Sequence, residues 1–478
     1  MRNTTFCFGV LCVWLLGCIS ANAEVKMASP FSNGMVLQQS TKAKIWGTAT
    51  PKSTVTLTAS WDYKNVNVVA NDKGHWTAWL STPKGSFTPY AITISDGSNP
   101  VVVRDVLIGE VWLAGGQSNM EMPLQGWGKQ KVTTGDKLIA GAQAYAGKIH
   151  VASVKTVYSQ TPLDTASIEW KDSTPTTINN VTAIGYMFAT NLVAKLQCPV
   201  GIIDCNRGGS SVEAWMPRDV LLNWSDVNLN DTIYKKMDEH TPCALYNGKL
   251  YPLRGYTMAG FLWYQGESNV GESRKFYTAR FSAMVQRWRQ DWGLGNLPFY
   301  FVQIAPYCYN GNQATCAAIL REAQAEAYHK IANSGIVGTV DLVTPKEDKS
   351  IHPANKASVA LRLANWALAE VYKQPNINHQ HPEYKSHKIK NGRAYVNFSN
   401  SKNGFNRAVD ITGFEMCGAD SVYYTAHATS KNNQVIVSCD SVRNPTQVRY
   451  CFRNFLLGNL ANKENLPILP FRTDKFEK

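Results

Sequence analysis

The spacing of apolar and polar residues changes character twice along the chain. Residues 24–105 hold short alternating runs, among them STVTLTAS, HWTAWL and YAITIS, which are separated by Gly, Pro, Asp and Ser. An alternation with period two is typical of half-buried strands, and no helical stripe interrupts the series. The pattern predicts a small β-sandwich over residues 24–105.

From residue 106, apolar runs of strand type alternate with helical stripes. VLIGEVWLAGG, PVGIIDC, YTMAGFLWYQGE, PFYFVQIAP and GIVGTVDL read as strands. The helix predicted near 272–290 places these apolar residues on one face: Tyr277, Phe281, Met284, Val285 and Trp288. Strands alternating with helices indicate a parallel sheet covered on both faces, so we expect an α/β domain over residues 106–375.

After residue 375 the alternating pattern returns. GRAYVNFS, SVYYTAHA, QVIVSCD and QVRYCF predict a second β region over residues 376–478. The polar stretch NINHQHPEYKSHK precedes it, and His379 and His381 there are candidate metal ligands. Because no third ligand fits a metal-site spacing, a solvated linker is the favoured interpretation.

Residues 1–23 have the features of a secretory signal peptide. Arg2 supplies the positive charge, residues 6–16 form an apolar run too short to span a bilayer, and Ala-Asn-Ala at 21–23 is a cleavage site. The alternative is a lipoprotein signal with Cys18 as the modified residue. Either signal predicts a secreted or periplasmic protein, and no later stretch is apolar enough for a transmembrane helix.

Charge and cysteine content narrow the function classes. The chain has 48 Lys and Arg against 35 Asp and Glu, a net charge of +13, but no run of five basic residues. This spread disfavours nucleic-acid binding and leaves a diffuse positive potential that mildly favours anionic ligands. The sequence has 11 cysteines and no Cys-x-x-Cys pair, which excludes zinc ribbons and thioredoxin chemistry. Disulfide pairing and oligomeric state stay open at this stage.

Unusual polar clusters follow four of the predicted strands. AGGQSNM, NRGGSSVEAW, QGESN and TPKEDKSIHPANK each begin at or near a strand end. The carboxyl ends of parallel strands meet at one edge of a sheet, where ligands bind in open α/β folds. We therefore expect these clusters to form one site.

The clusters supply the groups that acyl transfer needs. Ser118 is the candidate nucleophile, although alone it is as well explained as a helix N-cap. His352 is the candidate base, although a lone histidine is more often structural. Asp348 is the favoured acidic partner that would orient the imidazole, with Glu347 as the alternative and a Ser-His dyad as a third arrangement.

The tetrahedral intermediate also needs hydrogen-bond donors. The backbone amides of Ser118 and Gly209 and the side-chain amide of Gln265 are candidates for the oxyanion hole. Further candidate substrate contacts are Glu267, Asn269, Arg207, Arg321 and Trp215. Glu267 has an equally good interpretation as a helix cap, and Arg207 and Arg321 as structural ion pairs. This chemistry requires no metal and no organic cofactor.

With these residues identified, the chain resembles the sialate O-acetylesterase family, within the serine esterases named for Ser, Gly, Asn and His in four blocks (SGNH). GEVWLAGGQSNMEMPL, GGSSVEAWMP, WYQGESN and SIHPANK are similar to the four blocks, and MVLQQSTKAKIWGTA and PFRTD are similar to the family's ends. The resemblance implies a flavodoxin-like hydrolase core flanked by two β-sandwich-like regions. The family's last block usually has an acid three residues before its histidine, where this chain has Lys349.

The resemblance implies an exported carbohydrate O-acetylesterase acting on O-acetylated sialic acids. Acetylated xylan or another plant polysaccharide is the alternative substrate. A non-catalytic glycan-binding protein is the rival of another class, and the intact serine, histidine and glycine set argues against it. A two-carboxylate glycosidase is weaker still, because only Glu267 is well placed for it.

Overall fold

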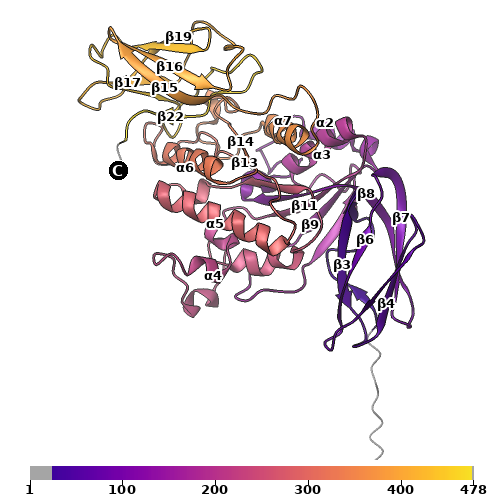
Figure 1. The fold of residues 1–478 in the computed structure, drawn as a ribbon. Coiled ribbons are helices and arrows are strands. Elements are labelled where there is room, and N and C mark those ends of the chain that lie inside the picture. The colour runs from indigo at the N-terminus through magenta and orange to yellow at the C-terminus, as the bar shows by residue number, and fades with distance from the viewer. Residues whose placement is uncertain (1–23, 476–478) are drawn as a thin grey trace, which may run out of the picture.

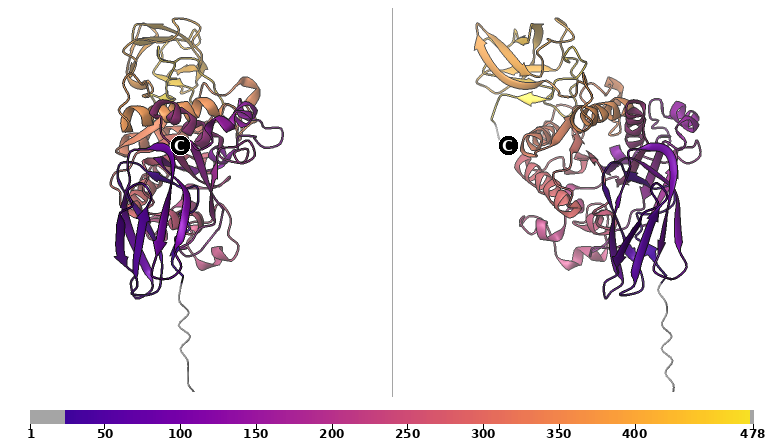
Figure 2. Two further views of the ribbon diagram at one scale, coloured as in Figure 1. Left: turned by 90° about the vertical axis from the view of Figure 1, so that its right-hand side faces the viewer. Right: turned by 45° about the vertical axis from the view of Figure 1, so that its right-hand side comes forward.

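The computed structural model describes residues 24–475, so the predicted signal peptide and Cys18 lie outside the described residues. Two β regions lie at opposite ends of a central α/β domain (Figures 1 and 2). The α/β class and the β flanks predicted from the sequence are confirmed.

The N-terminal region consists of two packed β layers. One sheet has the order β1-β3-β6, with β1 Lys26–Met27, β3 Lys42–Thr48 and β6 His75–Ser81. The other layer contains β5 Asn65–Val69, β4 Thr54–Ala59, β7 Ser86–Ser95 and the first part of β8 Val101–Gly116, with β2 Val36–Gln38 beside β8. Alternate residues of β4 and β6 point into the buried layer, as the period-two pattern predicts.

Strand β8 belongs to both regions. It pairs antiparallel with β7 between residues 101 and 108 and parallel with β11 and β12 between residues 110 and 116. The strand therefore runs without interruption past residue 105 and carries its C-terminal end into the centre of the α/β domain.

The central sheet has the order β10-β9-β11-β8-β12-β13-β14. Its strands are β9 Ile149–Val154, β10 Ile168–Asp172, β11 Val200–Asn206, β12 Gly260–Tyr264, β13 Phe299–Val302 and β14 Ser334–Val337, and only β10 is antiparallel to its neighbour. Without the β9–β10 pair the order is 2-1-3-4-5, the flavodoxin-like arrangement whose switch point lies between β8 and β12. The sequence analysis did not include the β9–β10 pair.

Helices cover both faces of this sheet (Figure 1). α3 Ala183–Leu196 and α7 Lys356–Trp366 pack on the face that carries Trp112 and Ala114 of β8. α5 Arg274–Trp292 and α6 Cys316–Lys330 pack on the opposite face. The short helices α1 Ser118–Glu121, α2 Gly135–Ala140 and α4 Arg218–Leu221 lie in the connections.

The C-terminal region contains two four-stranded antiparallel sheets, β15-β16-β20-β19 and β18-β17-β21-β22. Their bounds are β15 Glu383–Lys390, β16 Arg393–Ser399, β17 Phe414–Cys417, β18 Tyr424–Thr425, β19 His427–Lys431, β20 Gln434–Ser438, β21 Gln447–Tyr450 and β22 Phe471–Arg472.

The prediction of a solvated linker before this region is partly wrong. Glu383–Lys390 is a strand, and it read as a loop because this edge strand keeps mostly polar, exposed side chains. His381 is buried and contacts the Gly338 amide and the Pro467 carbonyl. His379 lies against Glu370, 2.9 Å from its carboxylate.

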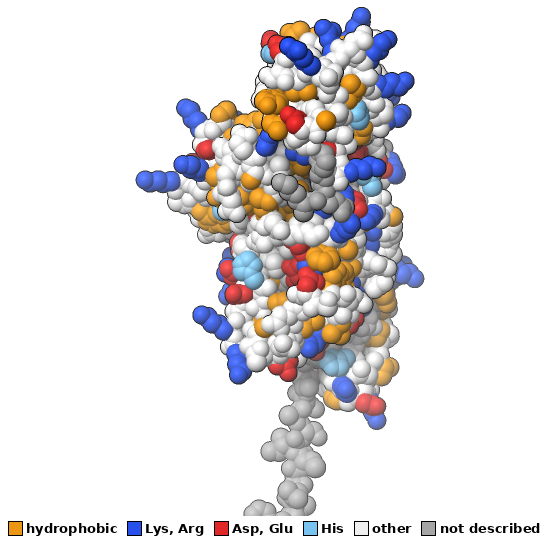
Figure 3. All heavy atoms as spheres, turned by 90° about the vertical axis from the view of Figure 1, so that its left-hand side faces the viewer, with side chains coloured by type: hydrophobic (Ala, Val, Ile, Leu, Met, Phe, Trp, Pro, Cys, Tyr) orange, Lys and Arg blue, Asp and Glu red, His pale blue; other side chains and the backbone are white. Residues whose placement is uncertain are grey.

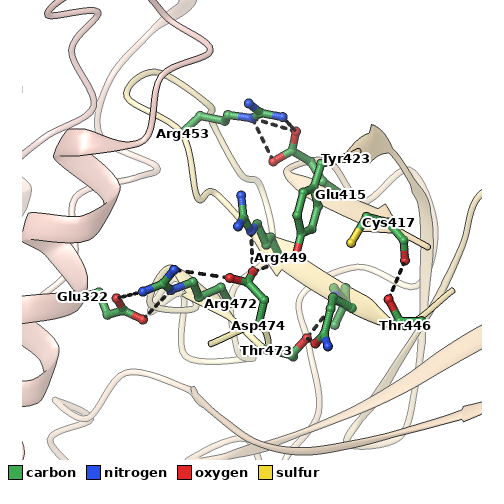
Figure 4. A network of polar contacts seen from close by, with 12 residues as sticks. Glu322, Glu415, Cys417, Tyr423, Thr446, Arg449, Arg453, Arg472, Thr473 and Asp474 are labelled. Atoms are coloured by element: carbon green, nitrogen blue, oxygen red, sulfur yellow. Dashed lines mark hydrogen bonds and ion pairs between the residues drawn. The ribbon is translucent and has the colours of Figure 1, made fainter. Parts of the chain in front are cut away.

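An ion-pair network attaches the C-terminal region to the α/β domain (Figure 4). Arg472 contacts both carboxylate oxygens of Glu322 on α6, at 2.9 and 2.8 Å. Asp474 joins Arg472 to Arg449, and Tyr423 donates to the same carboxylate at 2.7 Å. A bidentate pair between arginine and carboxylate fixes orientation as well as distance, so the last strand is held in register with α6.

The surface and the cysteines add little chemistry of their own. Lys and Arg side chains are scattered on the face shown in Figure 3, with acidic side chains between them. Within residues 24–475 all eight cysteines are unpaired thiols, and no helix is both long and apolar enough to cross a membrane.

Candidate active site

The turn that carries Ser118 is fixed to the neighbouring strand end. Gly116 has φ +134°, and a Cβ at this position would lie 2.2 Å from the carbonyl oxygen of Tyr264. The next residue, Gln117, donates its backbone N–H to the same carbonyl at 2.8 Å, and its side-chain oxygen accepts from the Gly266 amide at 3.0 Å. Only glycine tolerates this approach of two strand ends, which explains the glycine before the serine turn.

Ser118 is the first residue of α1 and is partly exposed. The N-cap position belongs to Gln117, so the interpretation of Ser118 as a capping residue does not hold. Within residues 24–475 the Ser118 hydroxyl makes no hydrogen bond, so it is available to a ligand.

The loop carrying His352 lies beside the serine turn. Asn119 donates to the carbonyl oxygen of Ile351 at 3.0 Å, which joins the residue after the serine to the residue before the histidine. His352 packs edge-on against Trp127, with ring centroids 5.1 Å apart. Burial, and secondarily the charge of Lys356, lower the pKa of His352 to about 4. The imidazole is therefore neutral at pH 7, as a general base must be.

An amide, not a carboxylate, contacts this imidazole. Nδ1 of His352 lies 3.1 Å from Oε1 of Gln130. Glu347 closes a capping box at Thr344 and accepts from the Ala354 amide at 3.1 Å, and the Asp348 carboxylate makes no hydrogen bond with any part of the chain that the structure describes. Neither Asp348 nor its alternative Glu347 contacts His352 in this structure, and Gln130 lies where the predicted acid would orient the ring.

Behind the serine turn lies a buried polar cluster that the sequence analysis missed. Asn119 is fully buried, donates to Oε1 of Glu267 at 2.6 Å and accepts from the ammonium of Lys356. Burial raises the pKa of Glu267 and lowers that of Lys356 to about 7, and the attraction of Glu267 opposes the second shift. Oε2 of Glu267 has no hydrogen-bond partner among the described residues. Two features of the sequence could have indicated this cluster: an asparagine directly after the serine and a lysine in the first turn of the apolar helix α7.

The two backbone amides predicted to form the oxyanion hole, those of Ser118 and Gly209, have no acceptor within the described residues. Gly209 adopts φ +76°. The neighbouring Gly208 lies beside the serine, where a Cβ would meet Ser118 Cβ at an ordinary 3.5 Å but Oε2 of Glu121 at only 2.6 Å. Its own amide donates to the Glu121 carboxylate at 2.6 Å and is not free. Ser118 and Gly209 are the two donors that fit the prediction.

Gln265 does not fit its predicted role as a third donor. Its side chain is fully buried, and its amide nitrogen donates to the Ser210 carbonyl at 3.0 Å and to Oδ1 of Asn269 at 2.7 Å. Both N–H groups are therefore used within the protein. Gln265 instead holds the loop that carries Gly209.

Two further predicted substrate contacts support the same loop from below. Asn269 accepts from the Val212 amide at 3.0 Å, and the fully buried Trp215 donates to Oγ of Ser210 at 2.9 Å. The substrate-contact role of Trp215 and Asn269 is corrected to support of the glycine loop.

Arg321 is also not a substrate contact. Its side chain is fully buried and donates to backbone carbonyls of Cys451 and Arg453 in the C-terminal region. The alternative ion pair with Glu322 is absent as well, because Glu322 pairs with Arg472 and Arg274.

Arg207 remains near the surface at the glycine loop. Its side chain is 37% exposed, Nε donates to the Tyr158 hydroxyl at 2.8 Å, and the guanidinium lies 3.2 Å from the Glu239 carboxylate. Its backbone N–H donates to Gly116 at 2.9 Å, next to the serine turn. Arg207 thus combines the predicted ion pair with a position beside the site.

The comparisons with known proteins agree with this geometry. Residues 108–370 match the profile of the carbohydrate esterases described as sialic acid-specific acetylesterases. The chain belongs to this family. It is therefore a carboxylic ester hydrolase of the carbohydrate acetylesterase type.

The alignments with named relatives cover more of the chain than the family profile does. The sialate O-acetylesterase of Mus musculus is 29% identical over an alignment of 419 positions that covers 76% of each chain. That of Homo sapiens is 28% identical over 395 residues, covering 76% of this chain and 74% of the human protein. A solved carbohydrate acetylesterase from Xanthomonas citri superposes with a TM-score of 0.84 at 31% identity, over 95% of this chain and all of that one.

Gln130→Ala is expected to lower kcat about tenfold, because the loss of one hydrogen bond leaves the His352 ring without a partner at Nδ1. Asp348→Asn serves as the matched variant and is expected to change kcat less than twofold. Steady-state hydrolysis of a chromogenic acetate ester measures both. A large loss of kcat in Asp348→Asn, together with an unchanged kcat in Gln130→Ala, would instead support a triad with Asp348 as the acid.

Lys356→Met is expected to lower kcat and to move the acid limb of the pH profile of kcat/KM to higher pH. The positive charge of Lys356 lowers the pKa of His352, and the neutral imidazole is the active base, so activity is lost as pH falls through this pKa. Removing the charge raises the pKa, and the loss then begins at higher pH. Lys346→Met, an exposed lysine on the same loop, is the control and should leave the profile in place.

Proposed function

We propose that the protein is an exported serine esterase that removes O-acetyl groups from sialic acids. The observation that supports the mechanism is the Ser118 hydroxyl, which has no partner in the described chain and whose turn is joined, through Asn119, to the backbone of the residue before His352. The features of a signal peptide in residues 1–23 support export, with lipid attachment at Cys18 as the alternative.

In the acylation step, Oγ of Ser118 attacks the acetyl carbonyl while His352 accepts the hydroxyl proton. The backbone amides of Ser118 and Gly209 stabilise the negative charge on the carbonyl oxygen. The C–O bond to the sugar then breaks, and the sugar hydroxyl leaves with the proton from His352.

In the second step, His352 removes a proton from water, which attacks the acetyl-serine. The tetrahedral intermediate forms at the same two amides, and its collapse releases acetate and returns the proton to Oγ of Ser118. Every proton that moves passes through the imidazole, which is why its neutral state and its orientation matter.

Two observations support sialic acids as the substrate class. The curated relatives are named for this substrate, and Arg207 lies beside the glycine loop with part of its guanidinium exposed. A carboxylate on the sugar would compete with Glu239 for this guanidinium. A neutral acetylated polysaccharide, in contrast, would leave the ion pair between Arg207 and Glu239 intact.

Ser118→Ala is expected to reduce acetate release below a few per cent of the wild-type rate, because it removes the nucleophile. Thermal unfolding should be unchanged, since the hydroxyl makes no internal hydrogen bond. The double variant with His352→Ala should be no slower than either single variant, because nucleophile and base act as one unit. Substantial activity in folded Ser118→Ala would mean that another group is the nucleophile.

Arg207→Met is expected to lower kcat/KM for an O-acetylated sialic acid about tenfold or more, the scale of a charged hydrogen bond. Hydrolysis of a neutral acetate ester should hardly change. Arg104→Met, an exposed arginine of the N-terminal sandwich, controls for the loss of charge. Equal losses on both esters, or no loss on either, would overturn the sialate assignment and favour a neutral acetylated polysaccharide.

A further inference from the structure

A groove lies between the N-terminal sandwich and the α/β domain. Its volume is about 610 Å³, within the range of small-molecule sites. Strands β1, β3 and β6 line it on one side, and the segments 164–165 and 252–254 line it on the other. None of the active-site residues described above belongs to its lining.

Lys44 reaches this groove from the outward face of β3. Its ammonium makes no hydrogen bond or ion pair with any residue in the described part of the chain, and it lies 5.5 Å from the ring centroid of Trp46. Gly255, at φ +83°, leaves the space that the ammonium uses, because a Cβ there would lie 3.1 Å from Nζ. Partial burial, and then the charge of Arg254, lower the pKa of Lys44.

Arg254 brings a second positive charge to the same groove. Its guanidinium stacks 3.4 Å above the ring centre of Tyr251 and donates to the carbonyl of that residue. The Asp164 carboxylate lies 3.8 Å away, but its side chain is 81% exposed, so this pair contributes little.

The other carboxylate of the lining is already neutralised. Both oxygens of Asp291 are engaged, one by Arg287 at 2.8 Å and the other by the Tyr246 hydroxyl. Among the lining residues, the exposed Asp164 is thus the one carboxylate left to balance Lys44 and Arg254, and an external anion would further relieve their repulsion.

Trp46 adds an apolar surface to this charge. It lies two residues after Lys44 on the same face of β3, is partly exposed and lines the groove. A flat aromatic ring beside two cations and the polar side chains of Ser29, Asn71 and Thr77 matches a ligand with one apolar face, several hydroxyls and one carboxylate.

We propose that this groove is an accessory binding site for a carboxylate-bearing sugar residue of a glycan, separate from the esterase site. Lys44 and Arg254 bind the carboxylate, and the ring of Trp46 packs against the sugar. The site would hold one acidic residue of a glycan chain while the serine acts on another.

The test is affinity electrophoresis of the full-length mature enzyme in native gels containing sialylated mucin whose O-acetyl esters have been removed by mild base. Wild type is expected to migrate at least twofold more slowly than in a gel without mucin, and Lys44→Gln to lose this retardation. Lys42→Gln, on the same strand but outside the groove, makes the same charge change and should remain retarded. Turnover of a chromogenic acetate ester by Lys44→Gln should equal that of wild type, which shows that the variant is folded.

Three results would overturn the proposal. Retardation of Lys44→Gln equal to wild type would exclude the groove. Retardation that persists in Lys44→Gln but disappears in Arg207→Met would place glycan binding at the esterase site. The third result is retardation by dextran sulfate that depends on Lys44, combined with either no retardation by mucin or equal retardation by desialylated mucin. It would assign the cations to a sulfated ligand. None of these results depends on whether Ser118 is the nucleophile.

Discussion

The arrangement of the site depends on the hydrogen bonds of one buried side chain, that of Asn119. Its amide nitrogen donates to Glu267 after β12 and to the backbone of Ile351 before the histidine, and its oxygen accepts from Lys356 on α7. The three partners come from two separate segments, one that follows β12 and one that follows β14. A buried amide with all of its partners in place is worth more than an apolar contact for specificity, because leaving any one of them unpaired costs about 1–3 kcal/mol.

This arrangement separates positioning from chemistry. Glu267 and Lys356 are both buried and both bonded to Asn119, so their contribution is to hold two loops together. The charge of Lys356 also lowers the pKa of His352. The reacting groups themselves are few: one hydroxyl, one imidazole and two backbone amides. Strand β8 extends this rigidity to the N-terminal sandwich, because one strand carries the serine at its end and belongs to the sandwich at its beginning.

The sequence predicted the layers of the fold well, because period-two and period-3.6 patterns report directly which face of an element is buried. It failed where a strand lacks that pattern, as in the polar edge strand β15 and the β9–β10 pair. The candidates Ser118 and Gly209 were recognisable because they closely follow the ends of β8 and β11, and His352 because it lies in the polar segment after β14. Asn119, Gln130 and Lys356 were not, since their roles come from contacts across 222 and 237 residues of chain. Gln265, Trp215 and Arg321 have suitable side chains for ligand binding, but burial commits them to the protein.

The central claim is that acetyl transfer passes through Ser118. Rapid mixing of the enzyme with an activated acetate ester, acid quenching within the first turnover and peptide mass spectrometry test it most directly. We expect one added acetyl group on the peptide that contains Ser118 and none on the same peptide of Ser118→Ala. Acetyl transfer to another residue would contradict this mechanism. So would turnover without a burst and without an acylated peptide at any quench time, measured under conditions where deacylation limits the rate.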